Sequence, residues 1–129
     1  MNLAAGLALV AAGGAAGAVL RYLATLAFAG TALVLPWGTL VANLAGCLGI
    51  GVITELVARG VLVSPEARLL LATGLCGGFT TMSSFVYELA AFYREGAMAL
   101  AGSYLVVTLA GSAACFALGV FAVQALWRT

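Results

Sequence analysis

Four polar residues lie inside long apolar stretches of this sequence: Arg21, Asn43, Glu55 and Glu88. A charged or amide side chain in lipid is unfavourable unless it pairs with another polar group or faces water. Such residues are therefore candidates for a functional path through a membrane. The Arg21 side chain is long enough to reach lipid headgroups, so it predicts either an anchor there or an attractor for anions at a pathway entrance.

The other three differ in what they can reach. Asn43 cannot extend to the headgroups, and its amide predicts either an interhelical hydrogen bond or a donor to an anion. Glu88 is expected to be protonated, hydrogen-bonded or facing a water-filled cavity. Glu55 precedes Arg59 by four residues, which predicts a salt bridge on one helix face near the membrane surface.

The stretch GLCGGFTTMSSF, residues 74–85, combines adjacent glycines with four hydroxyl residues. Gly77 and Gly78 predict a break in the helix, with the hydroxyls bonding freed backbone groups. Unwound backbone at membrane depth is tolerated only inside protein or along a cavity, and its carbonyls can hold a cation. The alternative is a kinked, packed helix whose serine and threonine hydroxyls bond to carbonyls one turn back.

Three hydroxyl residues, Tyr104, Thr108 and Ser112, follow one another at intervals of four. This spacing places them on one face of a helix that is otherwise apolar. They predict a lined path or a polar helix contact. A stripe of donors beside Asn43 suits an anion better than a cation, and Phe85 can add the positive edge of its ring.

The elements that position these residues are four predicted membrane spans. The chain has 129 residues, of which 65% are hydrophobic and 7% charged, with a mean hydropathy of +1.22. Such a composition indicates a single integral membrane domain rather than a soluble one. A span needs ~20 apolar residues, and the sequence predicts spans at about 3–28, 36–58, 66–93 and 98–126. Short links predict antiparallel neighbours, and small residues such as Gly13 and Gly17 predict close helix packing.

Arginines are distributed almost evenly between the two sides of the predicted bundle. One side holds Arg59, Arg68 and Arg128, and the other holds Arg94 with Arg21 if its side chain reaches out. Positive residues in the loops set orientation, so this small difference allows insertion in both directions. Four spans are few for enclosing a pathway, and an antiparallel homodimer would supply an inverted repeat. Insertion in one orientation stays open.

Composition also excludes several function classes. The net charge of +1 gives no clustered basic surface for nucleic acid. The chain has no histidine and no lysine, which removes common general bases, and we expect no enzyme. Cys47, Cys76 and Cys115 lie in apolar context without a pairing motif and are expected to be small hydrophobic residues.

Taken together, three motifs resemble the small fluoride channels of the Fluc (CrcB) family over essentially the whole chain. GGAAGAVLRYL resembles the family's first-span motif, GTLVANLAGCLGIG its second-span motif, and GLCGGFTTMSSFVYE its third-span signature, normally close to GxxGGxTTFSTF. The resemblance implies an all-α integral membrane protein with four transmembrane helices, the third broken near the bilayer midplane. It also implies an antiparallel dual-topology homodimer in a bacterial or archaeal cell membrane, exporting fluoride passively and conferring fluoride resistance.

The resemblance further implies roles for individual residues. The fluoride pathway would contain Asn43, Phe85, Met82, Tyr104, Thr108, Ser112, Thr39, Arg21 and Glu88. Asn43 would donate to fluoride, and Arg21 would be the vestibule arginine. A structural sodium ion (Na+) would lie at the dimer interface, held by the main-chain carbonyls of Gly77 and Thr80 from both subunits.

Met82 departs from the family pattern, which has a pore phenylalanine there. Methionine is flexible and apolar but has no ring edge with positive charge, so selectivity or rate is expected to differ. Ser84 in place of the family threonine is a smaller change.

Two other functions compete with the fluoride channel. A four-span proton-coupled multidrug exporter would need an acidic residue in the first span, where the one charged residue is Arg21. A membrane scaffold without transport would not explain a polar break, a buried amide and a hydroxyl stripe together.

Overall fold

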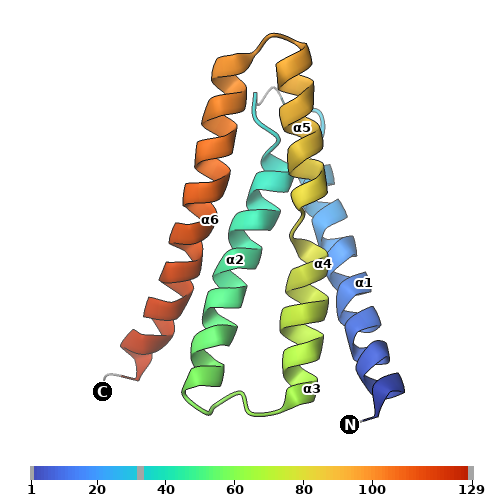
Figure 1. The fold of residues 1–129 in the computed structure, drawn as a ribbon, viewed down its shortest axis with the longest axis vertical. Helices are drawn as coiled ribbons and strands as arrows, with labels where there is room; N and C mark the ends of the chain where they lie inside the picture. Colours follow the sequence, from blue (N-terminus) through green and yellow to red (C-terminus); the bar gives the residue numbers. More distant parts are fainter. Residues whose placement is uncertain (1, 32–33, 128–129) are drawn as a thin grey trace.

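The computed structural model describes residues 2–31 and 34–127, and this part of the chain folds into helices with no strand. Four helical segments are long and apolar enough to cross a membrane: α1 (Leu3–Ala27), α2 (Trp37–Ala58), the third span Pro65–Arg94, and α6 (Met98–Leu126) (Figure 1). The predicted all-α fold with four transmembrane helices is therefore confirmed. Arg128, counted above for orientation, lies outside the described residues.

The third span consists of several pieces. It begins with α3 (Pro65–Arg68), continues through a π-helical segment, η1 (Leu69–Cys76), and a short α4 (Gly77–Phe79), and resumes after a break as α5 (Met82–Arg94). Thr80 and Thr81 lie between α4 and α5 in extended conformation, with ψ angles of 155° and 120°. The predicted break exists, near the middle of the span.

Its predicted position at Gly77 and Gly78 is wrong. Gly77 is helical, with φ −64° and ψ −36°, and Gly78 lies within α4. The chain leaves the helix two residues later because Thr81 acts as the N-cap of α5. Its side chain accepts a hydrogen bond from the backbone N–H of Ser84 at 3.2 Å, which stabilises a new helix start.

The glycines instead serve helix packing. A Cβ built on Gly17 would collide with backbone atoms of Leu75 and lie 2.7 Å from the nitrogen of Phe79. Likewise, a Cβ on Gly78 would collide with the backbone of Gly14. The backbones of α1 and the third span are therefore in direct contact, as the small residues of the first span predict. A second such contact, which the sequence motifs did not indicate, joins Gly51 of α2 to the backbone of Phe116 in α6.

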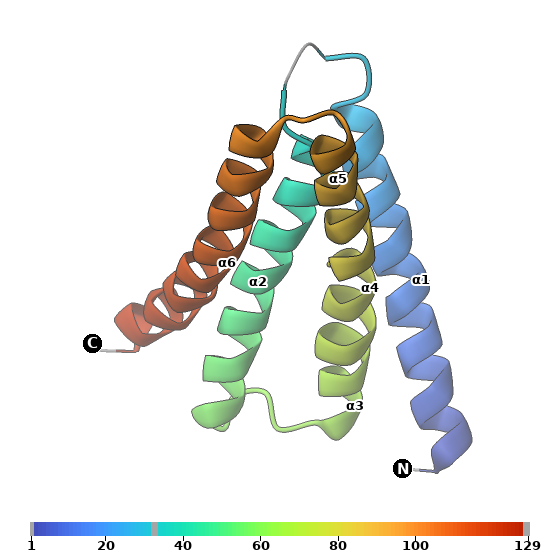
Figure 2. The ribbon, with the colours of Figure 1, turned by 45° about the horizontal axis from the view of Figure 1, so that its top comes forward.

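The helices alternate in direction. Figures 1 and 2 show the start of α1, the α2–α3 link and the end of α6 at one end of the bundle, with the other two links at the opposite end. Gly60 and Gly96 adopt positive φ angles of 69° and 71° just after helices, where glycine ends a helix without steric strain. Glu55 and Arg59 form the predicted salt bridge at 2.7 Å.

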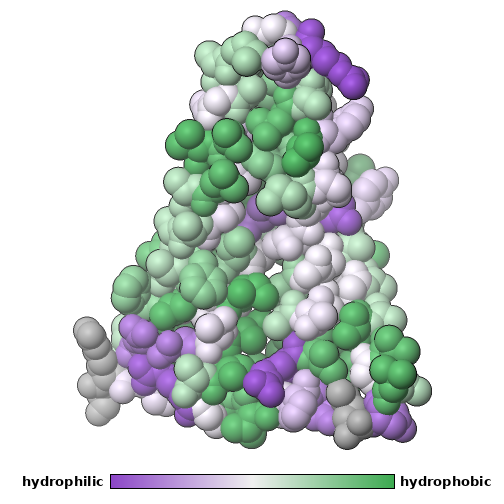
Figure 3. Space-filling view, in the orientation of Figure 1, coloured by the Kyte–Doolittle hydropathy of each residue, from purple (hydrophilic) through white to green (hydrophobic). Residues whose placement is uncertain are grey.

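Hydropathy on the surface agrees with a membrane environment. Figure 3 shows hydrophobic side chains over most of the length of the visible face, with hydrophilic residues mainly at its two ends and in a small area at mid-height. A bilayer core excludes polar groups from lipid-facing surfaces. The polar area at mid-height lies at about the level of the break in the third span (Figures 1 and 3).

Candidate functional site

A groove of about 300 Å³ lies beside the break in the third span. It is lined by Asn43, Cys47, Ile50, Thr80, Thr81, Met82, Phe85, Thr108, Leu109 and Ser112. The groove thus brings together predicted pathway residues from α2, α5 and α6. Its wall combines apolar surface with hydroxyl and amide groups at the depth of the membrane.

Asn43 fixes the backbone of the break. Its Nδ2 donates to the carbonyl of Thr81 at 3.1 Å, and its Oδ1 accepts from the N–H of Thr81 at 2.7 Å. The amide thereby replaces partners that a continuous helix would provide. Asn43 is 8% exposed, and its second N–H is not used by these two bonds. Both expectations for Asn43 are therefore compatible, since it makes an interhelical bond and retains a donor beside the groove.

Thr108 is a buried polar residue in the wall of the groove. Its side chain is 4% exposed, and its hydroxyl has no hydrogen-bond partner among the described residues. A buried hydroxyl without a partner is unfavourable by about 1–3 kcal/mol. The hydroxyl borders the groove, where it could donate to a polar species in the cavity.

Glu88 lies at the centre of a hydrogen-bonded cluster next to the groove. It accepts from the hydroxyl of Thr39 at 2.7 Å and from that of Tyr104 at 2.6 Å. Glu88 is therefore hydrogen-bonded, which is one of its three expected states. Tyr104 is fully buried, with the ring of Phe85 packed against it at a centroid distance of 5.0 Å.

The predicted hydroxyl stripe consequently divides into two parts. Thr108 and Ser112 line the groove, whereas Tyr104 bonds to Glu88 instead. Glu88 and Thr39 also border a separate hollow of about 210 Å³ near the α1–α2 link. The cluster therefore lies between the groove at mid-membrane and one end of the bundle.

The two predicted pore residues of α5 differ in exposure. Phe85 is 3% exposed and forms part of the buried core with Leu40 and Tyr104. Met82 is 64% exposed, although it also lines the groove. Position 82, where the third-span motif departs from its usual phenylalanine, thus lies at the open edge of the site.

Arg21 contacts the third span from the opposite side. Its Nε donates to the carbonyl of Gly78 at 3.2 Å, and the residue is half-buried. The groove residues come from α2, the third span and α6, whereas Arg21 lies on α1. Its side chain is held at the break rather than extended to the membrane surface.

The carbonyls of Gly77 and Thr80 lose their helical donors at the break. The N–H of Thr81, which a continuous helix would direct at Gly77, donates to Asn43. The N–H of Ser84, which would bond to Thr80, donates to the hydroxyl of Thr81. Gly77 is exposed on the surface of the single chain. Two carbonyls freed in this way are chemically suited to a hard cation such as sodium.

Comparison with known proteins identifies the family. A family model described as CrcB-like protein, Camphor Resistance (CrcB), matches residues 8–120. The chain belongs to the CrcB family. A relative from Chlorobium phaeobacteroides (strain BS1), named "Fluoride-specific ion channel FluC", is 48% identical over 118 residues, covering 90% of this chain and 91% of that protein.

Further relatives carry the same printed name. One from Chlorobaculum tepidum is 48% identical over 122 residues, covering 93% of this chain and 94% of the relative. Another from Agrobacterium fabrum is 45% identical over 125 residues, covering 95% of each chain. The resemblance drawn from the three sequence motifs is therefore confirmed, and the protein is a multi-pass membrane protein of this family.

Some site residues of this CrcB-family chain were missed by sequence reasoning. Cys47 lines the groove although it was expected only as hydrophobic filler. Thr81 has two roles at the break: it is the N-cap of α5, and its backbone is hydrogen-bonded to the Asn43 side chain. Threonine is a preferred N-cap residue, so Thr81 directly before the helix-forming residues 82–94 is the signal that could have located the break.

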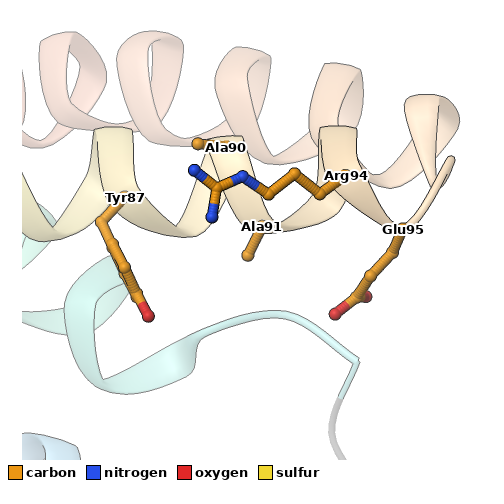
Figure 4. A pocket seen from close by; sticks show the side chains of 5 residues that line it. All are labelled: Tyr87, Ala90, Ala91, Arg94 and Glu95. Carbon is orange, nitrogen blue, oxygen red and sulfur yellow. The ribbon is translucent and has the colours of Figure 1, made fainter.

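A further surface hollow lies at the end of α5. It is lined by Tyr87, Ala90, Ala91, Arg94 and Glu95, and Figure 4 shows the Arg94 side chain extended back along α5 towards Tyr87. Arg94 is exposed on the surface of the chain. The α5 residues that line the groove are instead Met82 and Phe85. We therefore assign the candidate pathway to the groove at the break.

Proposed function

We propose that this CrcB-family protein is a passive, fluoride-selective channel that exports fluoride down its electrochemical gradient in a bacterial cell membrane. The single observation that carries this proposal is the buried, unpartnered hydroxyl of Thr108 in the groove beside Asn43. The printed names of the relatives supply the ion. Such a channel would confer resistance to fluoride.

The chemistry of the groove suits fluoride. Fluoride is small and strongly hydrated, so a path must replace its water with hydrogen-bond donors and weakly positive ring edges. Asn43, Thr108 and Ser112 offer donors, and Phe85 offers a ring. Backbone carbonyls would repel the anion, and the Thr81 carbonyl is already bonded to Asn43.

The driving force needs no ATP. Fluoride enters a cell as its neutral weak acid and then dissociates. An inside-negative membrane potential drives an anion outward, by about 2.3 kcal/mol per 100 mV for one charge. An open anion path therefore lowers internal fluoride. A proton-coupled exporter is not favoured, since α1 contains no acidic residue.

The complete channel is proposed to be an antiparallel homodimer. The near-even arginine distribution supports insertion in both directions. Exposed Met82 and Gly77 provide surface that a second copy could cover. The carbonyls of Gly77 and Thr80 would hold a structural sodium ion with their symmetry mates. That ion would link the subunits and is not the transported species.

Purified protein in liposomes tests the proposal. Liposomes loaded with potassium fluoride or potassium chloride are diluted into medium without halide, and a potassium ionophore removes the charge imbalance. We expect rapid fluoride efflux, little chloride efflux, and no requirement for ATP or a proton gradient. Empty liposomes provide the baseline. Equal release of chloride would contradict selectivity, and no release from properly assembled protein would contradict the channel function.

A further inference from the structure

Gly13, Gly17 and Arg21 form one face of α1, because they follow one another at intervals of four residues. The first two bring α1 into backbone contact with the third span. A Cβ on Gly13 would lie 3.0 Å from the Cα of Gly74, and one on Gly17 would lie 3.0 Å from the carbonyl carbon of Gly78. The next residue on this face, Arg21, therefore meets the third span at the break itself.

The break leaves the Gly78 carbonyl in need of a donor. In a continuous helix it would accept from the N–H of Met82, but the extended Thr80 and Thr81 turn α5 away from α4. Arg21 Nε fills this position at 3.2 Å. Hydrogen bonds from a charged donor to a carbonyl are stronger than neutral ones.

We infer that Arg21 is a positioning residue that holds the break open. Arg21 binds the end of α4 from the α1 side, while Asn43 binds Thr81 from the α2 side. Together the two side chains fix both edges of the two-residue break. The Thr80 carbonyl lies on the backbone between these bonds, and the Gly77 carbonyl lies one residue before the first of them, so the direction of both depends on Arg21. This role differs from attracting anions at an entrance.

The donor atom makes the inference testable, because three substitutions separate hydrogen bonding from charge. Arg21→Gln places an amide nitrogen at the same number of bonds from the backbone as Nε, without the charge. Arg21→Lys keeps the charge but has a methylene group where Nε was. Arg21→Met removes both the donor and the charge while keeping an unbranched side chain.

Hydrogen–deuterium exchange of the full-length protein in lipid nanodiscs measures the order of the break, through the peptide that covers residues 77–85. If Arg21 acts through its Nε bond, Arg21→Gln should exchange at close to the wild-type rate. Arg21→Lys and Arg21→Met should exchange about tenfold faster or more, as expected when a charge-assisted bond is lost. Protection by lysine but not glutamine would overturn the inference in favour of charge, and wild-type exchange in all three variants would also overturn it.

A spectroscopic measurement on the unmodified sequence covers the case in which every variant is disordered. Gly78–Phe79 is the one glycine–phenylalanine pair in the chain, so carbon-13 at glycine carbonyls and nitrogen-15 at phenylalanine identify the Gly78 carbonyl. Solid-state NMR of this protein, labelled also at arginine side-chain nitrogens, should show a direct contact between that carbonyl and Nε. Its absence would overturn the inference. Neither measurement depends on which ion passes, so failure here leaves the fluoride proposal intact.

Discussion

The two halves of the third span contact different partners in different ways. Before the break, η1 and α4 pack on α1, with glycine backbones in direct contact. After it, α5 packs on α6 and α2 through side chains, including the Glu88 cluster and the Phe85–Tyr104 ring pair. The first half provides close backbone packing, and the second provides polar side chains beside a cavity.

The change of partner coincides with the break. The glycine contacts with α1 lie before the two extended residues Thr80 and Thr81, and the polar contacts with α6 lie after them. Two extended residues allow the direction of the faces to change. Asn43 and Arg21 satisfy the backbone groups that this change exposes.

The largest expected effect comes from adding a methyl group where glycine lets α1 contact the first half of the third span. Gly17→Ala places a methyl group against the backbone of Leu75 and Phe79, where neither side can give way. We expect a loss of about 3 kcal/mol or more in folding free energy, or failure to assemble. Thermal unfolding in detergent checks this. Gly102→Ala is the control, since nothing lies within 4 Å of a Cβ there, and equal effects in both variants would contradict the packing account.

The next effect should come from Asn43→Asp. The carboxylate can still accept from the N–H of Thr81, but it would place an oxygen against the carbonyl that Asn43 now binds at 3.1 Å. It would also put negative charge beside an anion path. We expect fluoride efflux to fall about a hundredfold, a barrier increase of about 2.7 kcal/mol. Unchanged efflux in assembled protein would remove Asn43 from the pathway.

Thr108→Val separates function from stability in the second half. Valine keeps the shape of the side chain and removes the unpartnered hydroxyl. The free energy of unfolding should stay the same or rise by about 1 kcal/mol, while fluoride efflux falls by about tenfold. Thr54→Val, at an exposed position of α2, is the matched control. A loss of stability with normal efflux would mean that the hydroxyl serves the fold instead.

The smallest effect should come from Met82→Phe. Because Met82 is 64% exposed, folding free energy should change by less than about 0.5 kcal/mol. The aromatic edge should alter efflux only a few-fold, with fluoride still favoured over chloride. Efflux assays with both halides measure this. A complete loss of transport would show that the groove tolerates only an unbranched side chain at its edge.

The class of fold could be predicted from the sequence, because hydropathy determines the four spans and the short links determine their directions. The break could also be predicted, but not its position. Paired glycines suggest an unstable helix, yet at Gly78 they serve contact with Gly14. The position depends on the N-cap at Thr81, which competes with the glycines in a way that propensity alone does not resolve.

The partners of the polar residues were harder to predict than the residues themselves. Sequence patterns identified Arg21, Asn43 and Glu88 as functional candidates, since charge and amide groups in lipid are rare. That Glu88 bonds both Thr39 and Tyr104, or that Arg21 binds Gly78, depends on helix rotations and on contacts between residues far apart in sequence. The Glu55–Arg59 pair was predictable because its geometry is local to one helix.

The central claim is that the third span changes partners across an extended break at Thr80 and Thr81. Thr80–Thr81 is the one threonine–threonine pair in the sequence, so solid-state NMR of threonine-labelled protein in lipid isolates its signals. The structure predicts carbon shifts of extended backbone at both residues, and helical shifts at Thr39 and Thr108, which lie within α2 and α6. Helical shifts at Thr80 and Thr81 would contradict the break and the division of the span into two halves.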